Sequence, residues 1–110
     1  MDHEARERAL AENEARFRAV NERIEELSLE AGGGEDEVEF VCECGDPGCT
    51  EPLRLTVREY EWLRRDPARF AVLRGHEDSV EGEVVRDERG FRVVEKTGVA
   101  GEVARETDPR

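Results

Sequence analysis

Apolar residues recur at helical spacing through the first thirty positions of the chain. Residues 3–30 are rich in Ala, Glu and Arg and contain neither Gly nor Pro, which favours one uninterrupted helix. The apolar positions follow an alternating three- and four-residue repeat, with Asn13 at the first position that breaks it. The predicted seam consists of Leu10, Phe17, Val20, Ile24 and Leu27. This seam either docks on the rest of the chain or pairs with a second helix in a short coiled coil.

The pattern changes from helical to strand spacing after a run of three glycines. We interpret residues 1–31 as the N-terminal helix and residues 32–37 as a glycine-rich hinge. From Val38 to Cys44 apolar residues and cysteines alternate with Glu39, Val41 and Glu43, which is typical of a strand with one apolar face.

Short elements are predicted for the remainder of the chain. Thr56 and Glu59 fit a capping box and predict a helix from Val57 to about residue 65. Further strands are expected at 53–56, 70–73, 80–85 and 91–94, with the last two forming a hairpin, and residues 98–110 are expected to be a flexible tail. The predicted fold class is therefore α+β, in which a long amphipathic helix precedes a metal-binding domain at 38–97 of short antiparallel strands and one helix.

Composition limits how such a domain can be stabilised and what it can bind. Apolar residues make up 36% of the 110 residues, and so small a core usually needs a metal, disulfides or oligomerisation. A net charge of -12 argues against a nucleic-acid partner or an anionic membrane and favours a protein partner or a second copy of the chain. We find no signal-peptide pattern and no long apolar run, so a cytoplasmic location is expected.

Three cysteines within eight residues carry the most specific chemical signal in the chain. Cys42 and Cys44 are two residues apart, so a strand would place both side chains on the same side. The run Asp46-Pro47-Gly48-Cys49 has the residues of a type II turn, which would return Cys49 towards the other two. In a reducing compartment such a compact cluster favours a metal site over a disulfide framework.

His76 follows Gly75 and is the expected fourth ligand, with His3 and Asp46 as substitutes. Three thiolates and one imidazole form a closed tetrahedral shell for Zn²⁺, the expected cofactor. An iron–sulfur cluster, redox-active free thiols and a disulfide are the alternatives. The order of ligands is similar to that of CDGSH-type [2Fe-2S] proteins, but 26 residues separate Cys49 from His76 here, whereas those proteins carry the last two ligands close together.

The segment from Phe40 to Lys96 also resembles a group of short bacterial proteins. The shared features are Cys-x-Cys-Gly followed by a third cysteine, a Leu-Thr…Glu-Tyr segment and Gly-His-Glu. The resemblance implies that Cys42, Cys44, Cys49 and His76 act as one unit, and it implies no particular activity.

These features predict a small zinc-binding regulatory or adaptor protein that uses its N-terminal helix for protein–protein interaction. A thiol-based redox or metal sensor is the alternative. An enzyme is disfavoured, because four protein ligands leave no open coordination position. A zinc-dependent hydrolase would require water in place of His76 and Glu43 or Glu77 as the general base.

Overall fold

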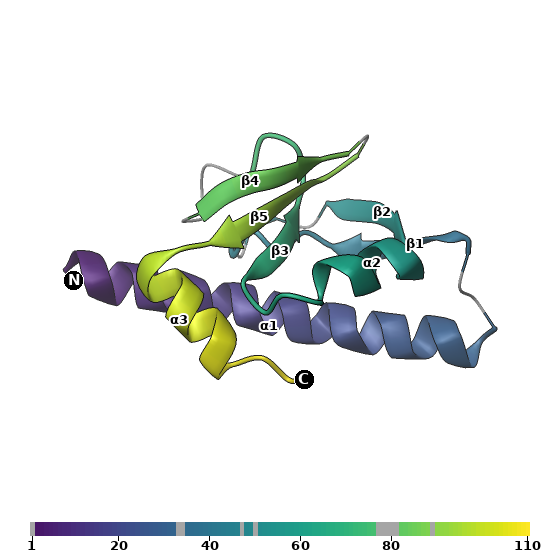
Figure 1. The fold of residues 1–110 in the computed structure, drawn as a ribbon, viewed down its shortest axis with the longest axis horizontal. Helices are drawn as coiled ribbons and strands as arrows, with labels where there is room; N and C mark the ends of the chain where they lie inside the picture. The colour runs from purple at the N-terminus through teal and green to yellow at the C-terminus, as the bar shows by residue number, and fades with distance from the viewer. Residues whose placement is uncertain (1, 33–34, 47, 50, 77–81, 89) are drawn as a thin grey trace.

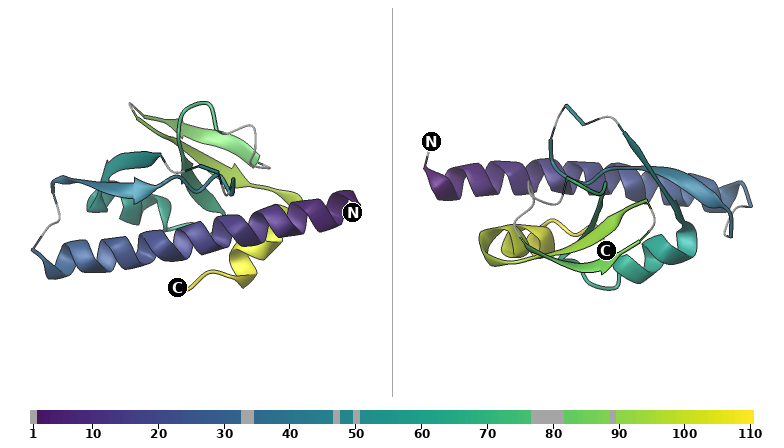
Figure 2. Two further views of the ribbon diagram at one scale, coloured as in Figure 1. Left: turned by 180° about the vertical axis from the view of Figure 1, so that it is seen from behind. Right: turned by 90° about the horizontal axis from the view of Figure 1, so that it is seen from above.

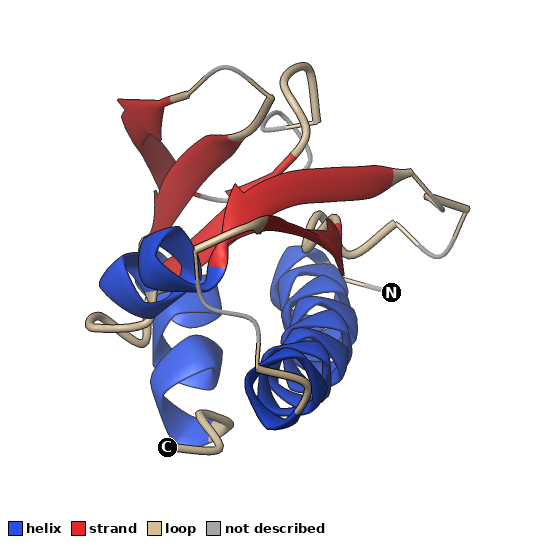
Figure 3. Ribbon diagram, turned by 90° about the vertical axis from the view of Figure 1, so that its right-hand side faces the viewer, coloured by secondary structure: helices blue, strands red, loops and turns tan. Residues whose placement is uncertain are grey.

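The fold of the protein is taken from a computed structural model, in which helices lie on one side of two small antiparallel sheets (Figure 1). The structure describes residues 2–32, 35–46, 48–49, 51–76, 82–88 and 90–110. Viewed along the long helix, the helices form a lower layer and the strands an upper one (Figure 3). The α+β class expected from the sequence is confirmed.

Helix α1 spans His3–Glu30, as the sequence predicted. Asp2 caps its N-terminus, because its carboxylate accepts a hydrogen bond of 2.8 Å from the amide of Ala5. The helix extends along the lower layer for most of the length of the molecule (Figure 2). No helix in the described part of the chain is both long and apolar enough to cross a membrane.

The strands form two separate sheets. β1 (Glu37–Val41) pairs with β2 (Pro52–Thr56), with Phe40 opposite Leu53. The second sheet has the order β3-β5-β4, where β3 is Arg69–Val72, β4 is Gly82–Asp87 and β5 is Arg92–Lys96. The strand expected to reach Cys44 ends at Val41. Gly33 and Gly34 of the predicted hinge, and Val80, Glu81 and Arg89 of the predicted hairpin, lie outside the described residues.

Helix α2 (Val57–Leu63) confirms the predicted capping box. Thr56 Oγ1 accepts from the amide of Glu59 at 3.1 Å, and the Glu59 carboxylate accepts from the amide of Thr56 at 2.8 Å. The helix buries Val57, Tyr60 and Leu63. The Tyr60 ring stacks on Phe40, with 4.7 Å between ring centroids, and thereby joins α2 to the first sheet.

The expectation of a flexible tail at 98–110 was wrong for most of that segment. Gly98–Glu106 forms helix α3, which packs against the N-terminal half of α1 (Figure 1). Its Ala100 and Val103 side chains are buried with Ala11 of α1. Small apolar residues at helical spacing were present in the sequence, but the glycines beside them concealed the helix.

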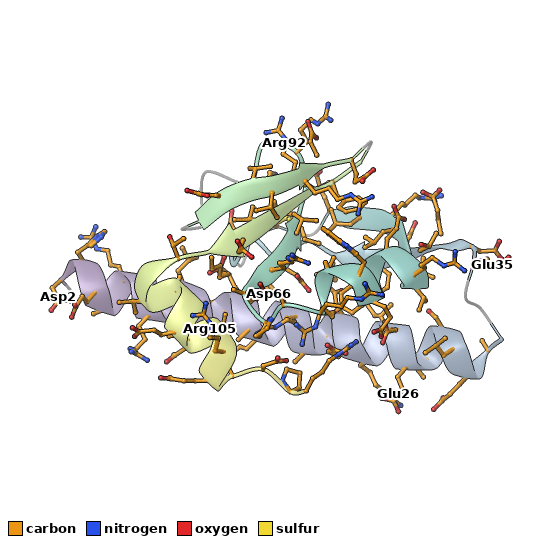
Figure 4. All side chains as sticks on the ribbon, viewed as in Figure 1. Asp2, Glu26, Glu35, Asp66, Arg92 and Arg105 are labelled. Carbon is orange, nitrogen blue, oxygen red and sulfur yellow. The ribbon has the colours of Figure 1, made fainter. Side chains whose placement is uncertain are left out.

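The face of α1 that is buried is polar, which corrects the expectation that the whole apolar seam docks on the rest of the chain. Pairing of the seam with a second helix stays a prediction. Val20 and Leu27 of the predicted seam remain 46% and 48% exposed, whereas Leu10, Phe17 and Ile24 are half-buried. On the buried face lie Ala11, Glu14, Arg18, Asn21 and Glu25. These positions follow the same three- and four-residue repeat, rotated around the helix. Glu26 projects from α1 on the side away from the sheets (Figure 4).

The buried charges of α1 are matched by partners from distant parts of the chain. Arg18 is fully buried, and its guanidinium donates to the carbonyl oxygens of Pro67 at 2.5 Å and Ala104 at 2.7 Å. Ala104 lies in the last turn of α3, where carbonyl groups lack helical partners, so Arg18 caps that helix. The Glu14 carboxylate pairs with Lys96 of β5, and both side chains are buried.

The burial of Glu14 predicts a pH dependence of stability. Burial raises the pKa of Glu14 from 4.5 to about 7, against the opposing charge of Lys96; Glu43 also raises this pKa, and Arg18 lowers it. A raised carboxyl pKa means that the folded protein binds the proton more tightly than the unfolded chain does. This contribution to stability is complete below pH 4.5 and is lost as pH rises through about 7.

We therefore expect the free energy of unfolding to fall by up to about 3 kcal/mol from this group between those pH values. The control is the double variant Glu14→Leu with Lys96→Met, which removes both charges together and should lack this slope at equal or higher stability. Denaturant unfolding of both metal-loaded proteins at several pH values measures the difference. Parallel pH profiles for the two proteins would contradict the assignment.

Candidate metal centre

The ends of three strands bring the four predicted ligands together. Cys42 and Cys44 follow β1, Cys49 precedes β2, and His76 follows β3. The connection between β1 and β2 that carries the cysteines passes over α1 (Figure 2). One ligand atom from each of the four residues lies within 4.8 Å of every other. The cluster therefore could bind a metal ion, and among the described residues it includes neither His3 nor Asp46, the proposed substitutes.

The distances between ligand atoms fit one tetrahedral ion. His76 Nδ1 lies 3.5 Å from Cys49 Sγ and 3.6 Å from Cys42 Sγ. A tetrahedral zinc ion with Zn–S of about 2.3 Å and Zn–N of about 2.0 Å places sulfur and nitrogen about 3.5 Å apart. The distances from His76 Nδ1 to the sulfurs of Cys42 and Cys49 thus agree with the distance expected if the three atoms bound one ion.

Burial makes the thiols of Cys42 and Cys44 weaker acids. It raises the pKa of Cys42 and of Cys44, whereas the backbone amide of Leu73 lowers the pKa of Cys42 and that of Asp46 lowers the pKa of Cys44. The Leu73 amide lies 3.2 Å from Cys42 Sγ. Amides in such positions donate to metal-bound thiolates, which retain surplus negative charge. The site thus has backbone donors in place for thiolates, which a bound cation would stabilise further.

Two local turns direct the later ligands inward. The amide of Cys49 donates to the carbonyl of Asp46 at 3.0 Å, and the Asp46 carboxylate accepts from the amide of Gly48 at 2.8 Å. Because Pro47 lies outside the described residues, the type II assignment stays a prediction. Gly75 adopts a φ of +100°, and the next amide, that of His76, donates to the carbonyl of Leu73 at 2.9 Å. Gly75 therefore lies in a turn directly before His76.

Gly45 allows the cysteine-bearing loop to touch α1. Its φ is +80°, in the left-handed region that favours glycine. A Cβ atom at this position would lie 2.5 Å from Glu14 Cγ and 2.8 Å from Leu10 Cδ1. Gly45 follows Cys44 directly. The same residue therefore determines both how closely the loop approaches α1 and how the backbone leaves Cys44.

Glu43 is a site residue whose role the sequence did not reveal, because the strand pattern placed it on a solvent face. The side chain is fully buried, and burial raises its pKa. One carboxylate oxygen accepts from the amide of Ala71 at 2.9 Å, and the other accepts from Asn21 Nδ2 at 2.7 Å. Both oxygens are thus engaged in holding the fold, which does not suit the general base of a hydrolase. Glu77, the other candidate base, lies outside the described residues.

Comparison with known proteins gives no further guide to the site. No family model matches the chain, and no match was found among the curated proteins or the solved structures.

Proposed function

We propose that the protein is a small zinc-binding regulatory or adaptor protein whose zinc ion is structural. The observation that carries this proposal is the convergence of four ligand atoms from Cys42, Cys44, Cys49 and His76 within 4.8 Å. The zinc would be the staple that a 110-residue chain with 36% apolar residues needs.

Zinc is preferred among the metals for two reasons. Three sulfurs and one imidazole nitrogen are a common ligand set of structural zinc, and their separations suit one tetrahedral ion. In a [2Fe-2S] cluster the protein ligands are divided between two irons, so a single tight group of four donors suits it less well. Purified protein should contain about one zinc per chain, and a content below about 0.2 would exclude the proposal.

A structural role follows from the number of ligands. Four protein ligands fill a tetrahedral shell, so the ion would hold the ends of β1, β2 and β3 together without an open position for water or substrate. The ion would supply charge compensation for the buried thiolates and a crosslink between the two sheets. We therefore expect no hydrolase activity from the metal-loaded protein.

The outer face of α1 is the proposed contact for a protein partner or a second copy. Val20 and Leu27 lie one heptad apart on this face and are about half exposed, beside the half-buried Phe17 and Ile24. Exposed apolar side chains in a continuous stripe favour contact with another apolar surface. The net charge of -12 disfavours nucleic acid and anionic membranes as partners.

Replacing the two exposed residues tests this contact. We expect the double variant Val20→Glu with Leu27→Glu to lose association, because each carboxylate would have to be desolvated in the interface. The matched control is Ala5→Glu with Ala19→Glu, which adds the same charge at exposed positions outside the stripe. Sedimentation of the metal-loaded proteins measures the mass. The same monomeric mass for wild type and the stripe variant would exclude dimerisation through this face.

A further inference from the structure

The Cys-x-Cys segment, residues 41–44, crosses from one sheet to the other at the metal centre. Val41 is the last residue of β1 and pairs with β2, whereas the backbone amide of Glu43 donates to the carbonyl of Ala71 in β3 at 2.8 Å. The Ala71 amide returns a hydrogen bond to the Glu43 carboxylate at 2.9 Å. The segment is therefore held to β3 on one side, where the Leu73 amide also contacts Cys42 Sγ.

Asn21 of α1 also binds this segment. Its Nδ2 group donates to the Val41 carbonyl at 2.9 Å, and its Oδ1 atom accepts from the Val41 amide at 2.8 Å. The side-chain amide thus pairs with the backbone as a neighbouring strand would. Asn21 Nδ2 also donates, at 2.7 Å, to the Glu43 carboxylate oxygen that does not bind Ala71. Asn21 is fully buried and contacts the residues immediately before and after Cys42.

The Asn21 contacts leave little freedom for the segment to shift. Both amide hydrogens and the amide oxygen of Asn21 are used, and so are both oxygens of Glu43. Buried polar groups in such a network lose a partner if the helix moves, and the interior offers no water to replace it. The close approach of Gly45 to Leu10 and Glu14 adds a second contact between the loop and the helix, about two turns away along α1.

We infer that Asn21 is a positioning residue of the metal centre, through which docking of α1 and metal binding stabilise each other. This inference rests on the proposed function, because it assumes that the four-residue cluster binds zinc. Residues that orient metal ligands through hydrogen bonds typically change metal affinity about 10- to 100-fold when they are removed. Coupling between two events is reciprocal, so metal loss would also weaken the docking of α1.

The physical basis of the coupling is the polar character of the buried helix face. Glu14, Arg18, Asn21 and Glu25 lose water on docking, and specific partners must compensate for that loss. For Asn21 these partners are the Val41 backbone and the Glu43 carboxylate, and they stay in place only while the Cys-x-Cys segment keeps its path between β1 and β3. A change in metal occupancy would therefore be transmitted to α1, the helix whose outer face is the proposed partner contact.

The test is a comparison of zinc affinity in variants of the full-length protein, measured by competition with a chromophoric chelator. Asn21→Ala is expected to weaken zinc binding at least tenfold. Asn13→Ala, in the same helix, is the control. Among the described residues, the Asn13 side chain makes one hydrogen bond, which its Oδ1 atom accepts from Arg16 at 3.4 Å. Val103→Ala controls for stability, because it loosens the packing of α1 on α3 away from the metal centre.

Both controls are expected to stay within about threefold of the wild-type affinity. If Asn21→Ala fails to fold, Asn21→Ser replaces it in the comparison, because serine keeps a small donor and acceptor at the same position. An affinity of the Asn21 variant equal to that of Val103→Ala would overturn the positioning role and leave the zinc site intact. A wild-type protein that binds no zinc would instead overturn the proposed function, and the inference with it.

Discussion

Replacing Cys49 with serine is expected to remove most of the folded stability of the protein. Cys49 is the only one of the three cysteines that is partly exposed, so serine at this position creates neither a large cavity nor a deeply buried hydroxyl. The loss would therefore come from the metal, since metal binding and folding form one equilibrium in a small zinc-stapled domain. We expect a decrease of at least about 3 kcal/mol in the free energy of unfolding in the presence of zinc.

Chelation provides the control for this variant. Stripping zinc from the wild type should lower its stability to that of Cys49→Ser, whereas the same chelator should leave the variant unchanged. Circular dichroism during denaturant unfolding follows helices and strands together. A wild type that keeps its unfolding midpoint after chelation, or a variant that still responds to chelator, would show that the fold does not depend on zinc held by Cys49.

Replacing Gly45 with alanine is expected to have the second largest effect. Alanine is disfavoured at a φ of +80°, and its Cβ atom would lie 2.5 Å from Glu14 Cγ, so either the loop or α1 must move. The two costs together predict a loss of about 2–4 kcal/mol of stability. The residue follows Cys44, and we expect weaker zinc binding as well.

Gly32 offers a matched control for the backbone contribution alone. Its φ of +85° is nearly the same, but no atom lies within 4 Å of a Cβ placed there. Gly32→Ala should therefore cost only about 1 kcal/mol. The difference between the two variants measures the close approach of the loop to α1. Equal losses for Gly45→Ala and Gly32→Ala would mean that this contact does not contribute to stability.

Much of the candidate site could be predicted from the sequence because its determinants are local. Cys42 and Cys44 lie two residues apart, and Asp46 and Gly75 supply turns next to the remaining ligands. The capping box at Thr56 and the helix at 3–30 likewise depend on residues within a few positions of one another. Such patterns specify an element before any long-range contact forms.

The residues whose burial the sequence did not reveal depend on partners far along the chain. The buried guanidinium of Arg18 donates a hydrogen bond to the carbonyl of Ala104, 86 residues away in the chain, and lies over the ring of Phe70 in a cation–π contact. Glu43 reads as a solvent-facing strand residue until Asn21 and Ala71 approach it. Hydropathy favoured docking through the apolar seam of α1, whereas the buried face carries polar side chains such as Arg18 and Asn21, which have hydrogen-bond partners on distant elements.

X-ray absorption at the zinc edge of the purified protein tests the central claim most directly, because it reports which atoms surround the metal. We predict one zinc per chain with three sulfur ligands at about 2.3 Å, one nitrogen ligand at about 2.0 Å and no oxygen ligand. Those ligands would be Cys42, Cys44, Cys49 and His76, whose donor atoms lie within 4.8 Å of one another. A protein without zinc, or a shell with fewer than three sulfurs or with bound water, would contradict the account.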